Sequence, residues 1–301
     1  MPRPRTSSKK PKTALTAKTA DRHDLYQRSV QAPEYEVDFL DQIHKAHTGH
    51  KAVSLREDFC GTALLCGEWL KSDPKRTATG LDIDRPTLEW GAAHNIAPLG
   101  GDVAKRITLL PQDVTIPTKQ KFDAICAYNY SYSVFHTREK LRSYFEAALK
   151  SLKDDGLFSL DAIGGWESQQ EMTERRSCEG FTYVWEQASY DPITNHFVCH
   201  ISYEFKDGTK LKNAFTYDWR LWQLQELREL LLEAGFVDVD AYWEGEDEDG
   251  SGNGEFYRLD GPPENDPGWN AYLVAKKSPS AKGTPDFKRF SKKPKKPGMP
   301  W

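Results

Sequence analysis

The feature that most constrains the fold is a regular alternation of apolar runs and amphipathic segments between residues 52 and 163. Short apolar runs predict buried strands at 52–56, 77–84, 106–110, 122–128 and 156–163. Segments with helical spacing of apolar residues lie at 62–71, 86–97 and 138–152. Right-handed crossovers leave few ways to join such elements, so we predict an α/β fold with a doubly wound, mainly parallel sheet.

The pattern changes after Gly164. Three runs (181–191, 196–205 and 210–219) alternate aromatic and polar residues around turn signals, which predicts an antiparallel insertion at about 164–218. A helix that starts at Pro33 precedes the first strand. A helix at 222–235 and two strands, 236–243 and 269–277, complete a predicted seven-stranded sheet.

Charge divides the chain into three parts. Residues 1–33 hold 8 Lys/Arg and 2 acids, and residues 276–301 hold 9 and 1, although the whole chain has a net charge of −4. The middle is therefore strongly acidic, which excludes a uniformly cationic nucleic-acid-binding surface. Because Lys, Pro, Gly and Ser dominate the ends, we expect a disordered basic arm at 1–22, a folded domain at 23–276 and a disordered basic tail at 277–301.

Two further sequence features bear on where the protein is found and on the state of its cysteines. No run approaches the length of apolar chain that a membrane helix needs, and the first residues do not resemble a secretory signal. The five cysteines include no C-x-x-C pair, so we expect reduced thiols, no structural zinc and a cytoplasmic protein. An organelle transit peptide at residues 1–20 stays an alternative to a plain arm.

Polar residues follow the first two predicted strands, at the edge where open parallel sheets bind ligands. The first strand continues into EDFCGTA (57–63), in which Gly61 permits close backbone approach before a helix N-terminus. The second ends in Asp82-Ile83-Asp84, 25 residues after Glu57, the usual distance to an acid that binds ribose hydroxyls. Asp84, just before a helix with an early proline, is typical of a helix cap.

These motifs resemble those of class I S-adenosylmethionine-dependent methyltransferases. EDFCGTA looks like their first motif, acid-x-Gly-x-Gly-x-Gly, with Phe59 and Ala63 in place of the outer glycines. GLDID (80–84), QDV (112–114) and FDAICAYNYSY (122–132) look like the second, third and fourth motifs. The likeness runs from about 35 to 276 and implies a Rossmann-like methyltransferase fold with S-adenosylmethionine as cofactor. Without the outer glycines a dinucleotide fits poorly, and no P-loop Lys-Ser/Thr is present.

The resemblance also implies roles for single residues. Its cofactor-binding set is Glu57, Phe59, Cys60, Gly61, Thr62, Asp82, Ile83, Asp113, Val114 and Asn129. In this set Glu57 lies near the cofactor's amino group, Asp82 holds the ribose, and Asp113 accepts from the adenine amino group. Gly61 lets backbone pass the methionyl part, and Ile83 packs on adenine. The alternative is that both aspartates only cap turns after strands.

The segment after the fourth strand carries the expected chemistry. Asn129-Tyr130-Ser131-Tyr132 resembles the Asn-x-Ser-aromatic segment of glycine-type amine N-methyltransferases, which implies that the Asn129 carbonyl orients an amine. Tyr132 or His136 would relay its proton. Alternatively Tyr132 covers the sheet and His136 is a solvated loop residue. Methyl transfer from a sulfonium needs alignment rather than a metal, so we expect no metal site.

Aromatic residues of the insertion and of a segment before the first helix form the expected acceptor site. That set is Tyr26, Arg28, Trp166, Tyr217, Trp219 and Arg220. Ring faces attract a cationic acceptor, and the Arg220 fork suits a carboxylate. As alternatives, most of the aromatic residues form the insertion's own core, Arg220 pairs with Asp218 or Glu226, and residues 24–31 are an ordinary helical lead-in.

We therefore expect a methyltransferase that acts on a small molecule, possibly an amine or amino acid. Two alternatives stay open: an RNA or protein acceptor delivered by the basic arms, and a non-catalytic S-adenosylmethionine-binding protein. The acidic loop EGEDEDGSGNGE (244–255) lacks the spacing of a calcium loop and reads as a solvated hairpin loop. The oligomeric state is not predictable from these patterns.

Overall fold

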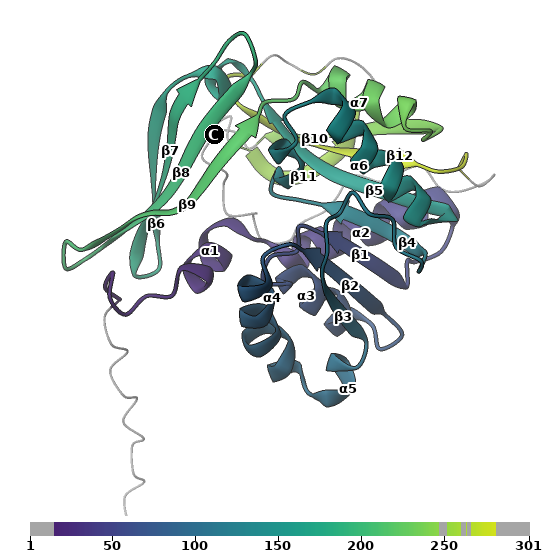
Figure 1. Cartoon of the computed structure of the whole chain (residues 1–301), viewed down its shortest axis with the longest axis horizontal. Coiled ribbons are helices and arrows are strands. Elements are labelled where there is room, and N and C mark those ends of the chain that lie inside the picture. Colours follow the sequence, from purple (N-terminus) through teal and green to yellow (C-terminus); the bar gives the residue numbers. More distant parts are fainter. Residues whose placement is uncertain (1–14, 247–251, 260–262, 264–265, 281–301) are drawn as a thin grey trace, which may run out of the picture.

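A computed structural model describes residues 15–246, 252–259, 263 and 266–280. Its centre is an eight-stranded sheet with the order β11-β10-β12-β5-β4-β1-β2-β3 (Figure 1). These strands are β1 (Ser54–Asp58), β2 (Thr77–Asp82), β3 (Ile107–Pro111), β4 (Phe122–Ala127), β5 (Leu152–Gly164), β10 (Asp238–Glu246), β11 (Gly252–Arg258) and β12 (Trp269–Lys276). Strands β1 to β5 pair in parallel, and β12, β10 and β11 add antiparallel pairs beyond β5.

Helices cover both faces of this sheet, because successive residues of its strands point to opposite sides. In β4, Ala124 and Cys126 join a core with α2 and α3, whereas Ile125 and Ala127 join a core with α6 and α7. The helices are α2 (Pro33–Thr48), α3 (Leu64–Ser72), α4 (Arg85–Gly91), α5 (Gly101–Ala104), α6 (Arg138–Ser151) and α7 (Leu224–Glu233). Short turns of other helix types lie at η1 (Ala92–Ile96), η2 (Ala97–Leu99), η3 (Ser131–Val134) and η4 (Trp166–Gln169).

A separate antiparallel sheet stands beside the large one (Figure 1). Its order is β6-β7-β8-β9, with β6 (Met172–Cys178), β7 (Phe181–Tyr190), β8 (His196–Phe205) and β9 (Lys210–Arg220). Its aromatic face is buried against α1 (Arg22–Val30), through Leu25 and Val30. Tyr130 and Ile163 of the larger body belong to the same core, so the two sheets share one apolar contact.

The predicted fold class is confirmed, with several differences in detail. The large sheet has eight strands rather than seven, because β11 occupies part of the segment that we interpreted as a hairpin loop. The antiparallel insertion also contains an unpredicted fourth strand, β6. Residues 15–22, expected in the disordered arm, pack against the small sheet, and the Ala17 N–H donates to Thr209 Oγ1 at 2.9 Å. Residues 277–280 of the expected tail are also described, and the Lys277 N–H donates to the Gly156 carbonyl at 3.2 Å. The other parts of the two basic ends, 1–14 and 281–301, lie outside the described residues.

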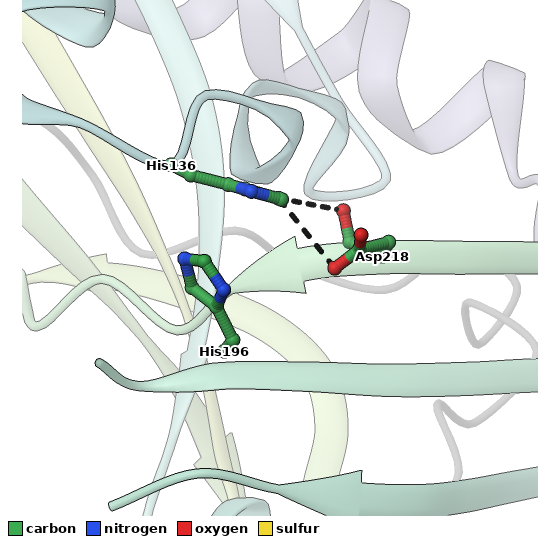
Figure 2. A group of neighbouring side chains, drawn as sticks. All are labelled: His136, His196 and Asp218. Atoms are coloured by element: carbon green, nitrogen blue, oxygen red, sulfur yellow. Dashed lines mark hydrogen bonds and ion pairs between the residues drawn. The ribbon is translucent and has the colours of Figure 1, made fainter. Parts of the chain in front are cut away.

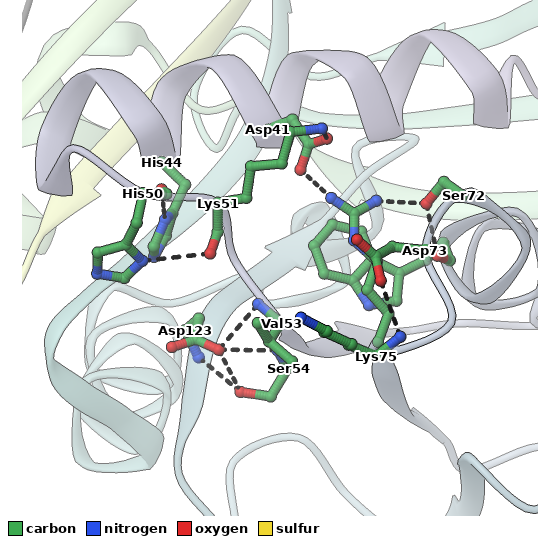
Figure 3. Close-up of polar contacts among 12 residues, drawn as sticks. Asp41, His44, His50, Lys51, Val53, Ser54, Ser72, Asp73, Lys75 and Asp123 are labelled. Carbon is green, nitrogen blue, oxygen red and sulfur yellow. Dashed lines mark hydrogen bonds and ion pairs between the residues drawn. The ribbon is translucent and has the colours of Figure 1, made fainter.

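The amino ends of the strands are closed by side chains (Figure 3). Asp123 at the start of β4 accepts hydrogen bonds from the backbone N–H groups of Val53 and Ser54, at 3.1 and 2.8 Å. Burial opposes ionisation of Asp123, but bonds from Lys153 and Ser54 outweigh it and lower the pKa of the carboxyl to about 2. Asp123 therefore satisfies backbone N–H groups at the amino ends of β1 and β4. Open parallel sheets bind ligands at the opposite, carboxyl edge.

All five cysteines are free thiols, and burial raises the pKa of Cys60, Cys66 and Cys126. These thiols therefore stay protonated and act as small apolar groups. Within the described ranges, none of the helices combines the length and the apolar character that crossing a membrane requires.

Candidate active site at the carboxyl edge of the parallel sheet

The turn after β1 has an unusual backbone. Phe59, Gly61 and Ala63 have φ angles of 55°, 51° and 54°, in the left-handed region that favours glycine. Phe59 and Ala63 are the two positions where the resembling motif has glycines, so the turn keeps that conformation at the expense of backbone strain. A Cβ built on Gly61 would meet only a methyl group of Thr87, at 3.9 Å. The space beside Gly61 is therefore open to a ligand.

Asp82 at the end of β2 holds this turn. Its carboxylate accepts the Gly61 N–H and the Asp84 N–H, both at 2.8 Å, and the side chain is half-buried. The next residue, Ile83, is 78% exposed, which leaves its side chain accessible for packing on a flat ligand. Asp84 caps α4 by accepting from the Thr87 N–H, as predicted.

Asp113 lies at the same edge of the sheet, because Asp82 is paired with Pro111 of β3. Its carboxylate is exposed and accepts the N–H of Thr115 at 2.8 Å, so the turn-capping role considered for it is present. It also lines a hollow of about 460 Å³ together with Phe135 and Lys140. Asp82 and Asp113 thus share an edge, although the residues that line this hollow do not include Asp82.

Glu57 is buried at the end of β1. It accepts the backbone N–H of Cys66 at 3.0 Å, at the beginning of α3. Burial, reinforced by the neighbouring charges of Glu36 and Asp82, raises the pKa of Glu57 to about 8. A carboxyl group in this setting favours a nearby cation, which would allow it to ionise.

The other members of the first motif also fix the turn. Cys60 is buried, and its backbone N–H donates to the carbonyl of Leu81 at 3.0 Å. The Thr62 hydroxyl accepts a 2.7 Å hydrogen bond from the side-chain amide of Gln27 on α1. The helix before α2 therefore touches the first motif directly, a contact that sequence patterns did not predict.

A second strained turn follows β4. Asn129 and Tyr130 have φ angles of 58° and 56°, and their N–H groups donate to the two oxygens of the buried Asp161 carboxylate, at 2.8 and 2.9 Å. The side-chain oxygen of Asn129 is buried and has no hydrogen-bond partner among the residues that the structure describes. Because a buried acceptor without a partner is unfavourable, this atom is poised to accept a ligand's N–H or O–H group.

The structure separates the two residues expected to relay a proton. Tyr132 is buried in the core on the α6 face, with Leu81 and Val114 among its members. His136 is half-buried at the joint with the small sheet, where its Nε2 lies 2.9 Å from the carbonyl oxygen of Asp218. Tyr132 therefore lies among residues that cover the sheet, as the alternative for it describes, whereas His136 is in a loop but is only partly solvated.

Three of the four aromatic residues of the predicted acceptor set belong to one core. Tyr217 and Trp219 are stacked with ring centroids 4.3 Å apart, and Tyr26 lies against the same core. Trp219 also meets Tyr130 edge to face at 6.4 Å, which brings the small sheet's aromatic face to the turn after β4. Tyr130 and Trp185 belong to this group, although neither was in the predicted set.

Three other members of that set lie elsewhere. Arg220 donates to Glu226 and to the carbonyl of His136, and it stacks on Trp222 at 3.7 Å, so two of its nitrogens already have partners. This is the pairing that we considered as an alternative to a carboxylate clamp, and it corrects the clamp assignment. Arg28 is exposed and lies over Phe181, and Trp166 is 48% exposed in η4.

A buried charged network under the site was not predicted. Arg56 and Asp58 of β1 are fully buried and joined by a 2.6 Å hydrogen bond. Arg56 also donates to Ser151 and to the carbonyl of Val114, and Asp58 accepts from Tyr144. The only sequence signal was a pair of opposite charges two residues apart, in or beside a predicted buried strand. The network fastens the Val114 loop to the centre of the sheet.

Comparisons with known proteins identify the fold. Neither the scan of protein-family models nor the search of curated proteins found a match. Among solved structures, an S-adenosylmethionine-dependent methyltransferase from Clostridium acetobutylicum ATCC 824 is similar over 84% of this chain and 96% of its own, with 14% identity and a TM-score of 0.61. An amino pentose methyltransferase from Micromonospora echinaspora is similar over 85% of this chain and 96% of its own, with 13% identity and a TM-score of 0.60.

A sugar N-methyltransferase from Streptoalloteichus sp. ATCC 53650 is similar over 92% of this chain and 98% of its own, with 16% identity and a TM-score of 0.56. The chain therefore has the fold of the S-adenosylmethionine-dependent methyltransferases. At such low identity the likeness establishes the fold alone.

Proposed function

We propose that this protein is an S-adenosylmethionine-dependent methyltransferase whose acceptor is a nitrogen of a small amine or amino acid. The observation that carries the proposal is the turn after β4, where the Asn129 side-chain oxygen is buried and no described residue bonds to it. Asp161 fixes the backbone on both sides of this oxygen. A site built to accept one hydrogen bond selects a ligand that can donate it.

The carboxyl edge fits the cofactor. The open space beside Gly61 accommodates a methionyl chain, and the exposed Ile83 next to Asp82 suits an adenine and its ribose. Glu57, whose pKa is raised to about 8 chiefly by burial, suits an ammonium group. When bound, S-adenosylmethionine supplies a methyl group activated by a sulfonium.

The chain's own residues then have to orient the acceptor and exclude water. The Asn129 oxygen accepts an N–H of the neutral amine, which directs the nitrogen lone pair away from Asn129. Tyr217 and Trp219 stack on each other, and Trp219 contacts Tyr130 of this turn. These rings would attract a positively charged amine before it loses its proton to solvent. A nitrogen acceptor is also what the printed name of the sugar N-methyltransferase states for that protein, whose fold this chain has.

The proposal is tested by incubating the full chain with methyl-labelled S-adenosylmethionine and panels of amino sugars, amino acids and simple amines. We expect mass spectrometry to show one or more amines that gain a labelled methyl group on nitrogen. The matched variant Asn129→Gly keeps the left-handed backbone but removes the side-chain oxygen, so methyl transfer should fall by a larger factor than cofactor affinity does.

Two results would contradict the proposal. Cofactor binding without any methylated product would favour the non-catalytic alternative. Labelling of RNA or protein in place of the small amines, lost when residues 1–20 and 279–301 are deleted, would favour a macromolecular acceptor.

A further inference from the structure

Two histidines and an aspartate meet at the joint between the two sheets (Figure 2). His136 comes from the loop between η3 and α6, His196 begins β8, and Asp218 lies near the end of β9. One ligand atom from each residue lies within 4.8 Å of the other two. The three positions are far apart in the sequence, which is why no metal-binding motif was visible there.

The fold holds these side chains in place. His196 pairs with Arg220 and Asp218 pairs with Val198 in the β8–β9 ladder, so His196 and Asp218 are diagonal neighbours on one face of the small sheet. The His136 carbonyl accepts a 3.1 Å hydrogen bond from Arg220. Two of the three candidate ligands therefore stand on rigid strands, and the third is tied to the same strands.

The separations suit coordination by one ion. His136 Nε2 lies 3.7 Å from a carboxylate oxygen of Asp218, and the two imidazole centroids are 4.2 Å apart. Ligand atoms on a tetrahedral zinc ion, at bond lengths of about 2.0–2.1 Å, are separated by roughly 3.3 Å. Small side-chain rotations would therefore bring all three onto one ion, with His136 Nε2 exchanging its bond to the Asp218 carbonyl for the metal.

We propose that His136, His196 and Asp218 form a binding site for a divalent first-row transition metal, with Zn²⁺ the ion that suits it best. Two imidazoles and one carboxylate are a ligand set that zinc accepts, with water in the fourth position. The site is accessible, because both histidines are half-buried and the Asp218 side chain is 69% exposed. Hard cations such as Mg²⁺ favour oxygen ligands and fit this set poorly.

The position gives the ion a mechanical role. His136 lies on the segment that also carries Asn129, whereas the other two ligands belong to the small sheet. A bound ion would therefore fasten the aromatic sheet to the turn after β4. It would also occupy the His136 nitrogen that we expected to relay a proton, so this site serves structure rather than methyl transfer.

The test uses the full chain after removal of metals with a chelator. Zn²⁺ is titrated in competition with a chromophoric chelator, and we expect the natural chain to bind one equivalent of Zn²⁺ tightly. His196→Ala and Asp218→Asn should each lower the affinity for this ion at least tenfold. His200→Ala is the matched control, because His200 lies on the same strand and face but bonds to Thr216 instead. It should leave the affinity unchanged.

A spectroscopic readout separates this site from other histidines. Co²⁺ bound in a tetrahedral site gives strong visible absorption, which we expect in the natural chain and in His200→Ala but not in His196→Ala. Equal Zn²⁺ affinity in all of these chains, or a Co²⁺ spectrum that survives His196→Ala, would overturn the proposal. Circular dichroism of each variant confirms that it is folded, and none of the readouts depends on methyltransferase activity.

Discussion

The two strained turns at the carboxyl edge share a backbone arrangement but differ in the burial of the carboxylate that holds them. After β1 and after β4, non-glycine residues adopt left-handed backbone, and a carboxylate from a neighbouring strand accepts the N–H groups of the turn. Asp82 is half-buried beside open space, whereas Asp161 is buried and points both oxygens at backbone. The first turn is thus arranged to admit a ligand beside it, and the second to hold one side chain in a fixed place.

The largest expected effect comes from removing the carboxylate of the second turn. Asp161→Ala leaves two buried N–H groups without an acceptor, which should lower the free energy of unfolding by about 3 kcal/mol. Methyl transfer should fall at least about 100-fold, because the turn that places Asn129 loses its support. Urea unfolding and steady-state kinetics measure the two effects.

Asp123→Ala is the matched control for that variant. It removes an aspartate that also holds backbone N–H groups, but at the opposite end of the sheet. It should destabilise the fold while leaving the activity of folded protein intact. An equal loss of activity in both variants would mean that Asp161 matters only for stability.

The first turn should respond in cofactor affinity instead. Asp82→Ala removes a charge-assisted hydrogen bond to the expected ribose and should weaken cofactor binding by about 1.5–3 kcal/mol. Asp84→Ala, which removes only the cap of α4, should change stability and not affinity. Calorimetry that shows unchanged affinity in folded Asp82→Ala would remove the ribose assignment.

Glu57, beside the first turn, should make the stability of the fold depend on pH. Because the pKa of folded Glu57 is raised from 4.5 to about 8, chiefly by burial, the folded state binds its proton more tightly than the unfolded chain. The free energy of unfolding should therefore decrease as pH rises from about 4.5 to about 8, with a slope of at most about 1.4 kcal/mol per pH unit from this group. Glu57→Gln should flatten that slope in denaturation curves recorded across the range. An unchanged slope would show that Glu57 titrates normally.

The smallest effect tests the strain itself. Ala63→Gly relieves a left-handed conformation that costs an alanine about 1–2 kcal/mol, but the added freedom of the unfolded chain offsets about 0.5–1 kcal/mol. The variant should be more stable by a few tenths to about 1 kcal/mol, as thermal unfolding would reveal. Destabilisation would mean that the buried methyl group of Ala63 contributes more than the strain costs.

The sequence predicted the central sheet well because its strands are buried on both faces and read as apolar runs. It missed β6 (Met172–Cys178) because this edge strand has the sequence MTERRSC, which is mostly polar and charged and gives no apolar pattern. It missed β11 because glycines start that strand. Short edge strands take their stability from neighbours rather than from their own pattern.

For the site, motif order placed Gly61 and the two aspartates at one edge, since each follows a strand of a parallel sheet. It could not find Asp161, which stands 32 residues after Asn129 and meets it only through the pairing of β4 with β5. Nor could it decide between partners of Arg220, because a guanidinium has several donors and the choice of Glu226 is made by tertiary packing.

The fully buried pair of Arg56 and Asp58 has a consequence for how this chain can diverge. Substitution of one partner alone leaves the other as an unpaired charge in the interior, whereas replacement of both with apolar residues is tolerated far better. Substitutions at these two positions should therefore occur together in related sequences, and a sequence that retains one of the two residues should retain the other.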